Sequence, residues 1–385
     1  MPYDRSSDSA VLPPGLSAVP GIATVVIPTA REPAAPTFLS GVIEGFYGRP
    51  WSHQVRMDYA DYLSQLGLNS YIYAPKADPW LRRQWQRHWP REEWLGLQEL
   101  AQHFARLGIS FGIGLSPFAL YAEYGPRQRD HLWARIDQLN GLGAPLLAIL
   151  FDDMPGDQAD LAGRQAEIVA DICAWTVAER IIVCPTYYSF DPVLERFFGR
   201  RPENYWAQLG HLLAPEVDIF WTGNRVCPDS VSIADLQRAR AEFKRPLVLW
   251  DNYPVNDGAV RSKHLFLDPL QGREQAPADI VHGHFCNPMI QARCSLPALT
   301  GLAALYSGAA ATQKVPWLQA TLGESTWRLL LRDSVLFRDI GLHGLGVARR
   351  QSLQAEYAAL NNPAAAEVVG WLRGDDDFDP ACLTD

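Results

Sequence analysis

Cysteine is scarce in this 385-residue chain, and its six positions are scattered. They stand at 173, 184, 227, 286, 294 and 382 with no CxxC pair, so the sequence predicts neither a disulfide framework nor a structural zinc site. No uninterrupted apolar run approaches the ~20 residues that cross a bilayer. The chain has 34 basic residues (Lys and Arg) and 43 acidic residues (Asp and Glu), which gives a net charge of −9. This charge disfavours a general affinity for nucleic acid or for an anionic membrane surface.

The first 38 residues lack the features of a secretory signal and those of a folded segment. No basic cluster precedes a continuous apolar stretch, so we favour a cytoplasmic location. The segment is rich in Pro, Ser and Ala and shows no sustained hydrophobic period. This composition predicts an irregular N-terminal arm, residues 1–38, outside the catalytic domain.

Apolar and aromatic residues are plentiful. The chain is 48% hydrophobic and holds 13 Trp, 14 Tyr and 15 Phe, enough for the large core of a globular protein. From residue 41 onward, short apolar runs alternate with longer amphipathic stretches, the rhythm of repeated βα units. A doubly wound open sheet is the alternative, but no GxGxxG or GxxxxGK[ST] follows the first run. We therefore predict a (β/α)8 TIM-type barrel of the α/β class over residues 39–307, with strands at 41–44, 70–73, 110–115, 146–151, 181–184, 217–221, 246–250 and 280–285.

After residue 307 the pattern is helical only, which predicts a C-terminal helical region over residues 308–385. Helices are expected at 317–337, 347–360 and 363–372, and the final GDDDFDPACLTD is interpreted as a solvated acidic tail. An apolar stripe of this size, if exposed, would be unusual in a monomer. It packs onto the barrel or pairs with a second subunit, and we favour a homodimer through these helices. The stripe comprises Trp317, Leu318, Trp327, Leu329, Leu330, Leu331, Val335 and Leu336.

Polar residues follow the predicted strands, at the end of the barrel where enzymes of this fold place their catalytic groups. Asp152 and Asp153 are the sharpest feature, because the apolar run LLAILF delivers two carboxylates directly into the mouth. Such a pair can divide acid and base roles. In the structural alternative, Asp153 caps the next helix and Asp152 makes a supporting hydrogen bond. Strand alternation aims only one of them inward, so both can be functional only if the backbone turns there.

Two further patterns have a functional and a structural interpretation. His282 and His284 share one face of the last predicted strand and could join the acids in a metal-dependent hydrolase. Without an HExxH motif or a histidine near Asp152 in the sequence, satisfied core histidines are favoured. The tryptophans between 80 and 94 alternate with arginines and could form a sugar-stacking rim. Their near-helical spacing favours a buried stripe with a solvated basic face.

Seven segments stand in order along the chain: GVIEGFYGRPW (41–51), LNSYIYAPKAD (68–78), LLAILFDDM (146–154), CPTYY (184–188), WTG (221–223), WDNYPVND (250–257) and CNP (286–288). Together they resemble the motifs of glycoside hydrolase family 84, which contains O-GlcNAcases and bacterial β-N-acetylglucosaminidases. The resemblance covers residues 40–306 and is far more specific than any single motif. It implies a TIM barrel and a retaining glycosidase without an enzyme nucleophile, in which the substrate's 2-acetamido oxygen forms an oxazoline. No cofactor is implied.

The resemblance also implies a role for each matching residue. Asp152 would hold the acetamido N–H and stabilise the oxazoline, and Asp153 would be the general acid and then the general base. Tyr188, rather than its neighbour Tyr187, would bond the acetamido oxygen, and Asn252 would help hold that group. Thr222 and Trp250 would shape the acetyl pocket. The sugar hydroxyls would be bound by the Gly45 carbonyl, Lys76, Asp257 and Asn287.

The expected substrate is an N-acetylglucosamine-bearing glycoprotein or small glycoside, with neither a nucleic-acid nor a membrane partner. Two alternatives stay open at this point. A catalytically silent sugar-binding barrel would not require both Asp152 and Asp153. A hyaluronidase-like polysaccharide hydrolase is the other, because proteins of that name occur in the family.

Overall fold

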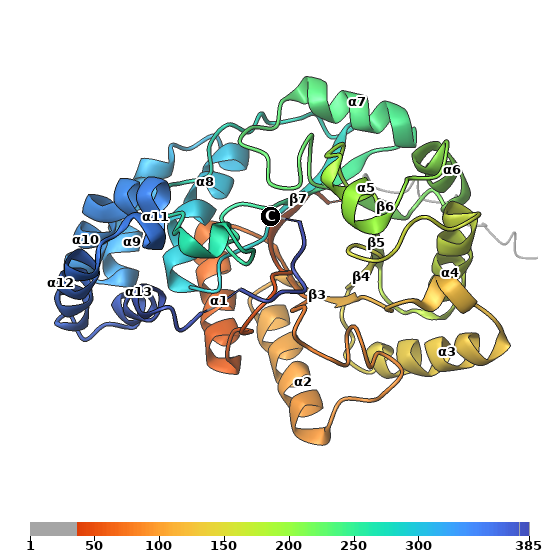
Figure 1. Ribbon diagram of the computed structural model, residues 1–385. Coiled ribbons are helices and arrows are strands. Elements are labelled where there is room, and N and C mark those ends of the chain that lie inside the picture. The colour runs from red at the N-terminus through yellow and green to blue at the C-terminus, as the bar shows by residue number, and fades with distance from the viewer. Residues whose placement is uncertain (1–36, 377, 385) are drawn as a thin grey trace, which may run out of the picture. The chain divides into compact units, whose positions relative to one another are not determined.

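Eight parallel strands, paired in chain order, form a closed barrel in the computed structural model (Figure 1). This confirms the predicted fold class. Each predicted strand agrees with an observed one within one residue at both ends, except the first, which begins two residues earlier than predicted. The structure describes residues 37–376 and 378–384, so nearly all of the predicted arm lies outside the described residues. The strands are β1 (Leu39–Glu44), β2 (Ser70–Tyr73), β3 (Ser110–Leu115), β4 (Leu146–Leu150), β5 (Arg180–Cys184), β6 (Asp218–Trp221), β7 (Leu247–Asp251) and β8 (Val281–Cys286).

The helices around the barrel begin and end at local sequence signals. Ser52 caps the first helix by accepting from the Val55 N–H, and Gly67 ends it at φ 76°, a conformation that glycine adopts without strain. Ser232 and Asp235 form a capping box at the start of α7. The helices are α1 (His53–Leu66), α2 (Arg91–Arg106), α3 (Pro126–Asn140), α4 (Leu161–Trp175), α5 (Val193–Phe198), α6 (Tyr205–Leu212), α7 (Ile233–Phe243) and α8 (Leu296–Ser307).

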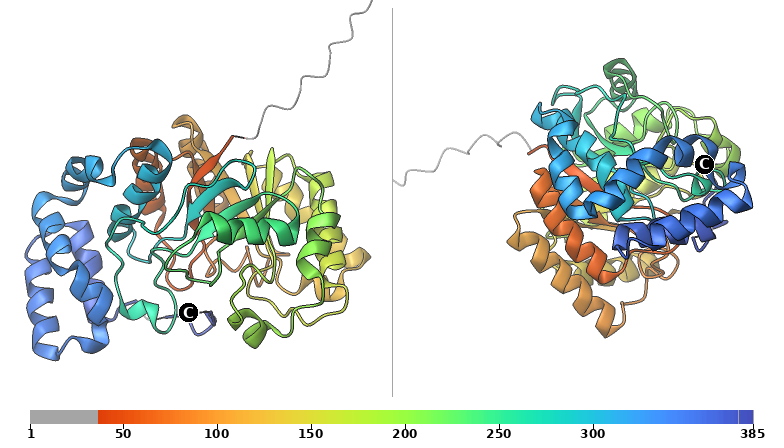
Figure 2. Two further views of the ribbon diagram at one scale, coloured as in Figure 1. Left: turned by 90° about the horizontal axis from the view of Figure 1, so that it is seen from above. Right: turned by 90° about the vertical axis from the view of Figure 1, so that its left-hand side faces the viewer.

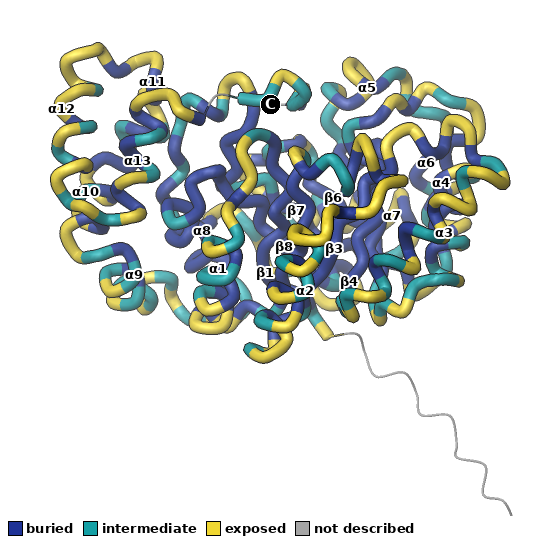
Figure 3. Tube along the Cα trace, turned by 90° about the horizontal axis from the view of Figure 1, so that it is seen from below, coloured by how far each residue is buried: buried dark blue, intermediate teal, exposed yellow. Residues whose placement is uncertain are grey.

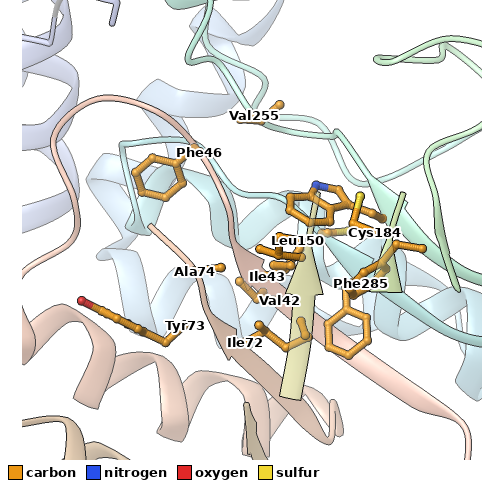
Figure 4. Packing of buried hydrophobic residues seen from close by; sticks show 14 of the residues in the cluster. Val42, Ile43, Phe46, Ile72, Tyr73, Ala74, Leu150, Cys184, Val255 and Phe285 are labelled. Carbon is orange, nitrogen blue, oxygen red and sulfur yellow. The ribbon is translucent and has the colours of Figure 1, made fainter. Parts of the chain in front are cut away.

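Apolar side chains fill the interior of the barrel and leave no open channel through it among the described residues (Figure 4). The Phe220 ring meets Trp250 and Phe285 edge to face, with centroid distances of 5.3 and 5.9 Å. Glycine is required where strands approach closely, because a Cβ at Gly41 would lie 1.7 Å from the Ser70 carbonyl oxygen. The interior is packed, and enzymes of this fold bind their substrates at the carboxyl ends of the strands.

The helices after Ser307 stand beside α1 and α8 (Figures 1 and 2). One of the predicted helices is divided, because Gly323 (φ 81°) separates α9 from α10. Side chains anchor the region to the barrel loops: the Trp371 indole donates to the Ser262 carbonyl, and the Glu367 carboxylate accepts from the Arg293 N–H. The elements are α9 (Val315–Leu322), α10 (Glu324–Val335), a π-helical turn (Leu336–Ile340), α11 (Gly341–Gly344), α12 (Val347–Ala358) and α13 (Pro363–Arg373).

The apolar stripe of this region is largely covered within the chain. Leu318, Trp327 and Leu330 are buried, whereas Leu331 and Val335 remain exposed. Among the described residues, no helix combines the length and apolar character needed to cross a bilayer.

The acidic tail differs from the expectation of a solvated terminus. After α13 the chain returns across the barrel, and its end lies over the open end of the strands (Figure 1). Asp376 and Thr384 are both buried, and the tube in Figure 3 shows this end of the chain against the barrel loops. The expectation was wrong because acidic composition alone does not reveal a distant basic partner: Asp376 pairs with Arg49, which follows β1.

Candidate active site

All ten residues that the sequence analysis assigned to the site line a single cavity at the carboxyl ends of the strands. The cavity contains about 440 Å³ of empty space, its open mouth included. Every strand except β3 supplies a residue to its wall, directly or from the loop that follows. The ten are Gly45, Lys76, Asp152, Asp153, Tyr188, Thr222, Trp250, Asn252, Asp257 and Asn287.

A left-handed residue brings both aspartates into the cavity. Strand β4 ends at Leu150, and Asp153 has φ 55°, a backbone conformation that side chains other than glycine, asparagine and aspartate seldom adopt. The backbone thus makes the turn that the alternation argument requires. Asp153 does not cap the next helix, because α4 begins after Asp160.

Asp152 has one paired carboxylate oxygen and one open oxygen. Its Oδ2 forms an ion pair with the Lys76 ammonium, and both side chains are buried. The ammonium also lies 5.8 Å from the centre of the Tyr47 ring and 5.7 Å from that of Trp250. Asp152 Oδ1 is buried and has no hydrogen-bond partner in the part of the chain that the structure describes. A buried carboxylate oxygen without a donor is costly, so this atom is ready to accept a hydrogen bond from a ligand.

Two phenols hold Asp153. The Tyr47 hydroxyl donates to Oδ2 at 2.8 Å, and the Tyr188 hydroxyl donates to Oδ1 at 3.0 Å. Burial, followed by the negative charge of Asp153, raises the pKa of both tyrosines well above 10.0. Both phenols therefore stay protonated donors at physiological pH. Tyr187 points elsewhere, because its hydroxyl donates to the Gly199 carbonyl.

Amides and an indole form the opposite wall. Asn252 Oδ1 accepts from the Trp250 indole and from Asn287 Nδ2, each at 3.0 Å, and its own Nδ2 donates to the Val226 carbonyl at 2.9 Å. Asn287 Oδ1 accepts from the Gly45 N–H at 3.2 Å. A Cβ at Gly45 would lie 2.4 Å from the Trp250 ring, so only glycine fits. This bonding fixes the wall before any ligand enters.

Asp257 and Thr222 complete the predicted set. Asp257 accepts from the Tyr47 backbone N–H at 2.7 Å. Burial raises the pKa of Asp257 to about 6, against the lowering effect of that hydrogen bond. The Thr222 hydroxyl donates to the Arg225 carbonyl at 3.1 Å, so this side chain supports the loop that lines the cavity.

Tyr47 and Arg82 support the site but were not predicted from the sequence. Tyr47 lies within the first motif, but the strand-end argument gave it no role. Arg82 was assigned to a solvated basic face, yet it is buried: its guanidinium donates to the Asp153 carbonyl at 2.9 Å and to Ser116 Oγ at 2.8 Å. Trp85 and Trp89 are buried, in agreement with the interpretation of these tryptophans as a buried stripe. Arg82 thus holds the backbone of the strained turn at Asp153.

The two strand histidines do not line the mouth cavity. His282 Nδ1 lies 2.7 Å from Asp218, and His284 Nε2 lies 3.0 Å from Asp251. These pairings match the interpretation as satisfied structural histidines. Within residues 37–376 and 378–384, no group of three or more His, Cys, Asp or Glu side chains is arranged to hold a metal ion.

Known proteins resemble the chain in sequence and in structure. Protein O-GlcNAcase of Rattus norvegicus is 29% identical over 287 residues, which are 72% of this chain and 31% of that protein. The Mus musculus protein of the same name is 30% identical over 278 residues, 70% and 30% of the two chains. The chain thus spans about a third of the length of these curated relatives.

A solved structure extends the similarity to the fold. A mutant O-GlcNAc hydrolase from Thermobaculum terrenum aligns with a TM-score of 0.69 and 28% identity, covering 88% of this chain and 81% of that one. A family model described as beta-N-acetylglucosaminidase matches residues 40–326, the whole barrel and the start of α10. With this match over most of its length, the chain belongs to the beta-N-acetylglucosaminidase family, glycoside hydrolase family 84.

Proposed function

We propose that this protein is a retaining β-N-acetylglucosaminidase, O-GlcNAcase-like, that cleaves terminal β-linked N-acetylglucosamine through an oxazoline intermediate. The observation that carries the proposal is the open Oδ1 of Asp152, a buried acceptor beside a second carboxylate. In a substrate-assisted mechanism the 2-acetamido oxygen attacks the anomeric carbon, and positive charge develops on the acetamido nitrogen. Asp152 accepts the hydrogen bond from that N–H and stabilises the charge.

Asp153 moves the proton. It protonates the glycosidic oxygen as the bond to the anomeric carbon breaks, and it then takes a proton from the water that opens the oxazoline. The phenols of Tyr47 and Tyr188 orient its carboxyl group. Tyr188 turns its hydroxyl to the acetamido oxygen when substrate binds, a short movement because the phenol already lies in the cavity wall.

The remaining residues bind the sugar. Asp257, Asn287 and the Gly45 carbonyl receive the hydroxyl groups. Lys76 donates a hydrogen bond to a sugar hydroxyl, and its ion pair holds the Asp152 carboxylate in position. The acetyl pocket is shaped by three residues whose positions are fixed by hydrogen bonds to neighbouring groups: Thr222, Trp250 and Asn252.

Turnover of a chromogenic substrate tests the proposal. p-Nitrophenyl β-N-acetylglucosaminide should be hydrolysed, and the β-glucoside that lacks the acetamido group should not. The released sugar should keep the β-configuration in a proton NMR time course. Equal turnover of the two glycosides would refute substrate assistance, and binding of N-acetylglucosamine without turnover would identify a silent sugar-binding barrel.

The natural substrate and assembly form the second part of the proposal. We infer that the substrate is a glycoprotein, whose aglycone is a protein, as the name of the relatives indicates for them, and that the enzyme acts in the cytoplasm. Leu331 and Val335 on α10 remain exposed and provide an apolar contact for a homodimer. Light scattering should give twice 43.0 kDa. A mass of 43.0 kDa that does not rise with concentration would refute the dimer.

A further inference from the structure

The C-terminal segment, defined as Asp376 and residues 378–384, is attached at the rim of the barrel mouth. The Asp376 carboxylate accepts from Arg49 through Nε at 3.0 Å and Nη2 at 2.7 Å, and its other oxygen accepts from Gln291 Nε2 at 2.9 Å. The Asp376 side chain is 3% exposed, whereas Arg49 is 71% exposed. The segment thus begins at a fixed point between the loops that follow β1 and β8.

The other end of the segment enters the cavity. A turn at Asp379, in which the Ala381 N–H donates to Oδ1 and the Cys382 N–H to the main-chain oxygen, redirects the chain. Cys382 and Thr384 then line the cavity together with the two catalytic aspartates. Thr384 Oγ1 lies 3.4 Å from the Tyr188 hydroxyl. Thr384 therefore contacts the group to which the proposed function assigns the acetamido oxygen.

We propose that this C-terminal segment is an intramolecular competitor of the substrate, held in the mouth by the Arg49–Asp376 ion pair. The inference rests on the proposed function, because it takes Tyr188 as a ligand-binding group. Thr384 and the acetamido oxygen cannot both occupy the position beside this phenol. The segment must leave before the sugar is fully bound, and the apparent affinity is reduced by the fraction of molecules in the closed state.

The contacts suit a segment that opens reversibly. Its anchor joins the buried Asp376 carboxylate to an arginine that is exposed to solvent, so dissolved salt screens the pair and weakens it. Leu383, between the two cavity-lining residues, is exposed rather than packed in the core. Segments with few buried apolar contacts open at low free energy.

Full-length variants that release the anchor test the proposal. Arg49→Met and Asp376→Asn should each lower KM for p-nitrophenyl β-N-acetylglucosaminide about two- to fivefold, the range that an ion pair of this kind supports, with kcat unchanged. Arg83→Met is the matched control: it removes an exposed arginine from the loop after β2 and should leave KM as it is. Moderate salt should lower the KM of the unmodified protein and leave that of Arg49→Met unchanged.

A binding measurement separates this inference from the proposed function. The dissociation constant of N-acetylglucosamine, from calorimetry, should fall by the same factor in both anchor variants, and it needs no turnover. An unchanged constant in both would overturn the competitor. A weaker affinity in both would also overturn it, because the segment would then complete the site. If the protein hydrolyses no substrate but the variants bind the sugar more tightly, the proposed enzymatic function is refuted and the proposal of a competing segment still holds.

Discussion

Asp152 and Asp251 both stand at the end of a strand in the same barrel, yet their surroundings differ completely. Asp251 accepts from Arg273 Nε and Nη2, each at 2.8 Å, and lies 3.0 Å from His284 Nε2. Burial would raise the pKa of Asp251, but the charge and hydrogen bonds of Arg273 and the His284 contact lower it to about 2. Among the described residues, the Asp152 carboxylate has one partner, Lys76, and one open oxygen.

The comparison teaches that position at a strand end does not by itself mark a reactive carboxylate. The site is distinguished by a hydrogen-bond acceptor, Asp152 Oδ1, that has no partner among the described residues and belongs to a residue that lines a cavity. Asp251 has two committed oxygens and does not line the mouth, so it supports the structure. Asp152 retains an acceptor where a ligand can reach it.

Replacement of the proposed acid should have the largest effect. Asp153→Asn should lower kcat/KM by about 10²–10⁴-fold for substrates with poor leaving groups, since general acid assistance supplies that much. Substrates with an acidic phenol should lose less in the first step. Steady-state kinetics over a leaving-group series gives the answer, and an equal loss across the series, with glycosylation limiting throughout, would contradict the assignment.

Replacement of Asp152 should lower the rate somewhat less than replacement of Asp153, but it should do so for every 2-acetamido substrate. Asp152→Asn should lower the rate about 10²–10³-fold for every 2-acetamido substrate, because the charge that stabilises the intermediate is lost. A better leaving group should not restore the rate. Thermal unfolding is the control, because the variant leaves Lys76 without its buried counter-ion. Rates equal to the unmodified protein's with good leaving groups would mean that the two aspartates have exchanged roles.

Asp257 should give a smaller effect that depends on pH. Its pKa is about 6, and the carboxylate accepts hydrogen bonds from sugar hydroxyls better than the carboxylic acid does. KM should therefore rise, by less than about tenfold, as the pH falls through 6. Asp257→Asn should remove this step, and KM–pH profiles of the two proteins provide the test. Since the pKa is higher in the folded state than in the unfolded state, stability should decrease as the pH rises from about 4 to 6.

Asp251→Asn should have the smallest effect on turnover and a large one on stability. Loss of one partner of a buried ion pair typically costs about 3–5 kcal/mol, so urea unfolding should shift strongly while kcat per folded molecule stays nearly constant. The carboxylate is stabilised in the folded protein, and the variant should lose the part of the acid unfolding that occurs between about pH 4 and 2. A loss of turnover as large as that of Asp152→Asn, in correctly folded protein, would dissolve the distinction between the two aspartates.

Much of the barrel could be predicted from the sequence, because each strand is a short apolar run bounded by polar residues. The helix over 317–337 could not, since the positive φ of Gly323 depends on the tertiary arrangement. Residue spacing alone leaves the strand-end carboxylates 152 and 251 equivalent. Their difference comes from Arg273 and His284, which reach Asp251 from distant parts of the chain.

The resemblance supplied the candidate site, and the structure adds its supports. Arg82 could not be recognised because two of its partners are main-chain carbonyls, which leave no pattern in the sequence, and the third is Ser116, 34 positions away. The tail presented the opposite difficulty, because an acidic run is typical of a solvated end. Its burial depends on Arg49, 327 positions away in the chain.

The proposed function requires that the substrate's own acetamido oxygen is the nucleophile and that Asp152 stabilises the charge that develops on the acetamido nitrogen. The most direct measurement is the rate for p-nitrophenyl glycosides whose N-acetyl group carries none, one, two or three fluorine atoms. Each fluorine withdraws electrons from the carbonyl oxygen, so kcat/KM should fall stepwise along the series. A rate that is independent of fluorine content would show that the acetamido oxygen does not attack, and it would contradict the account.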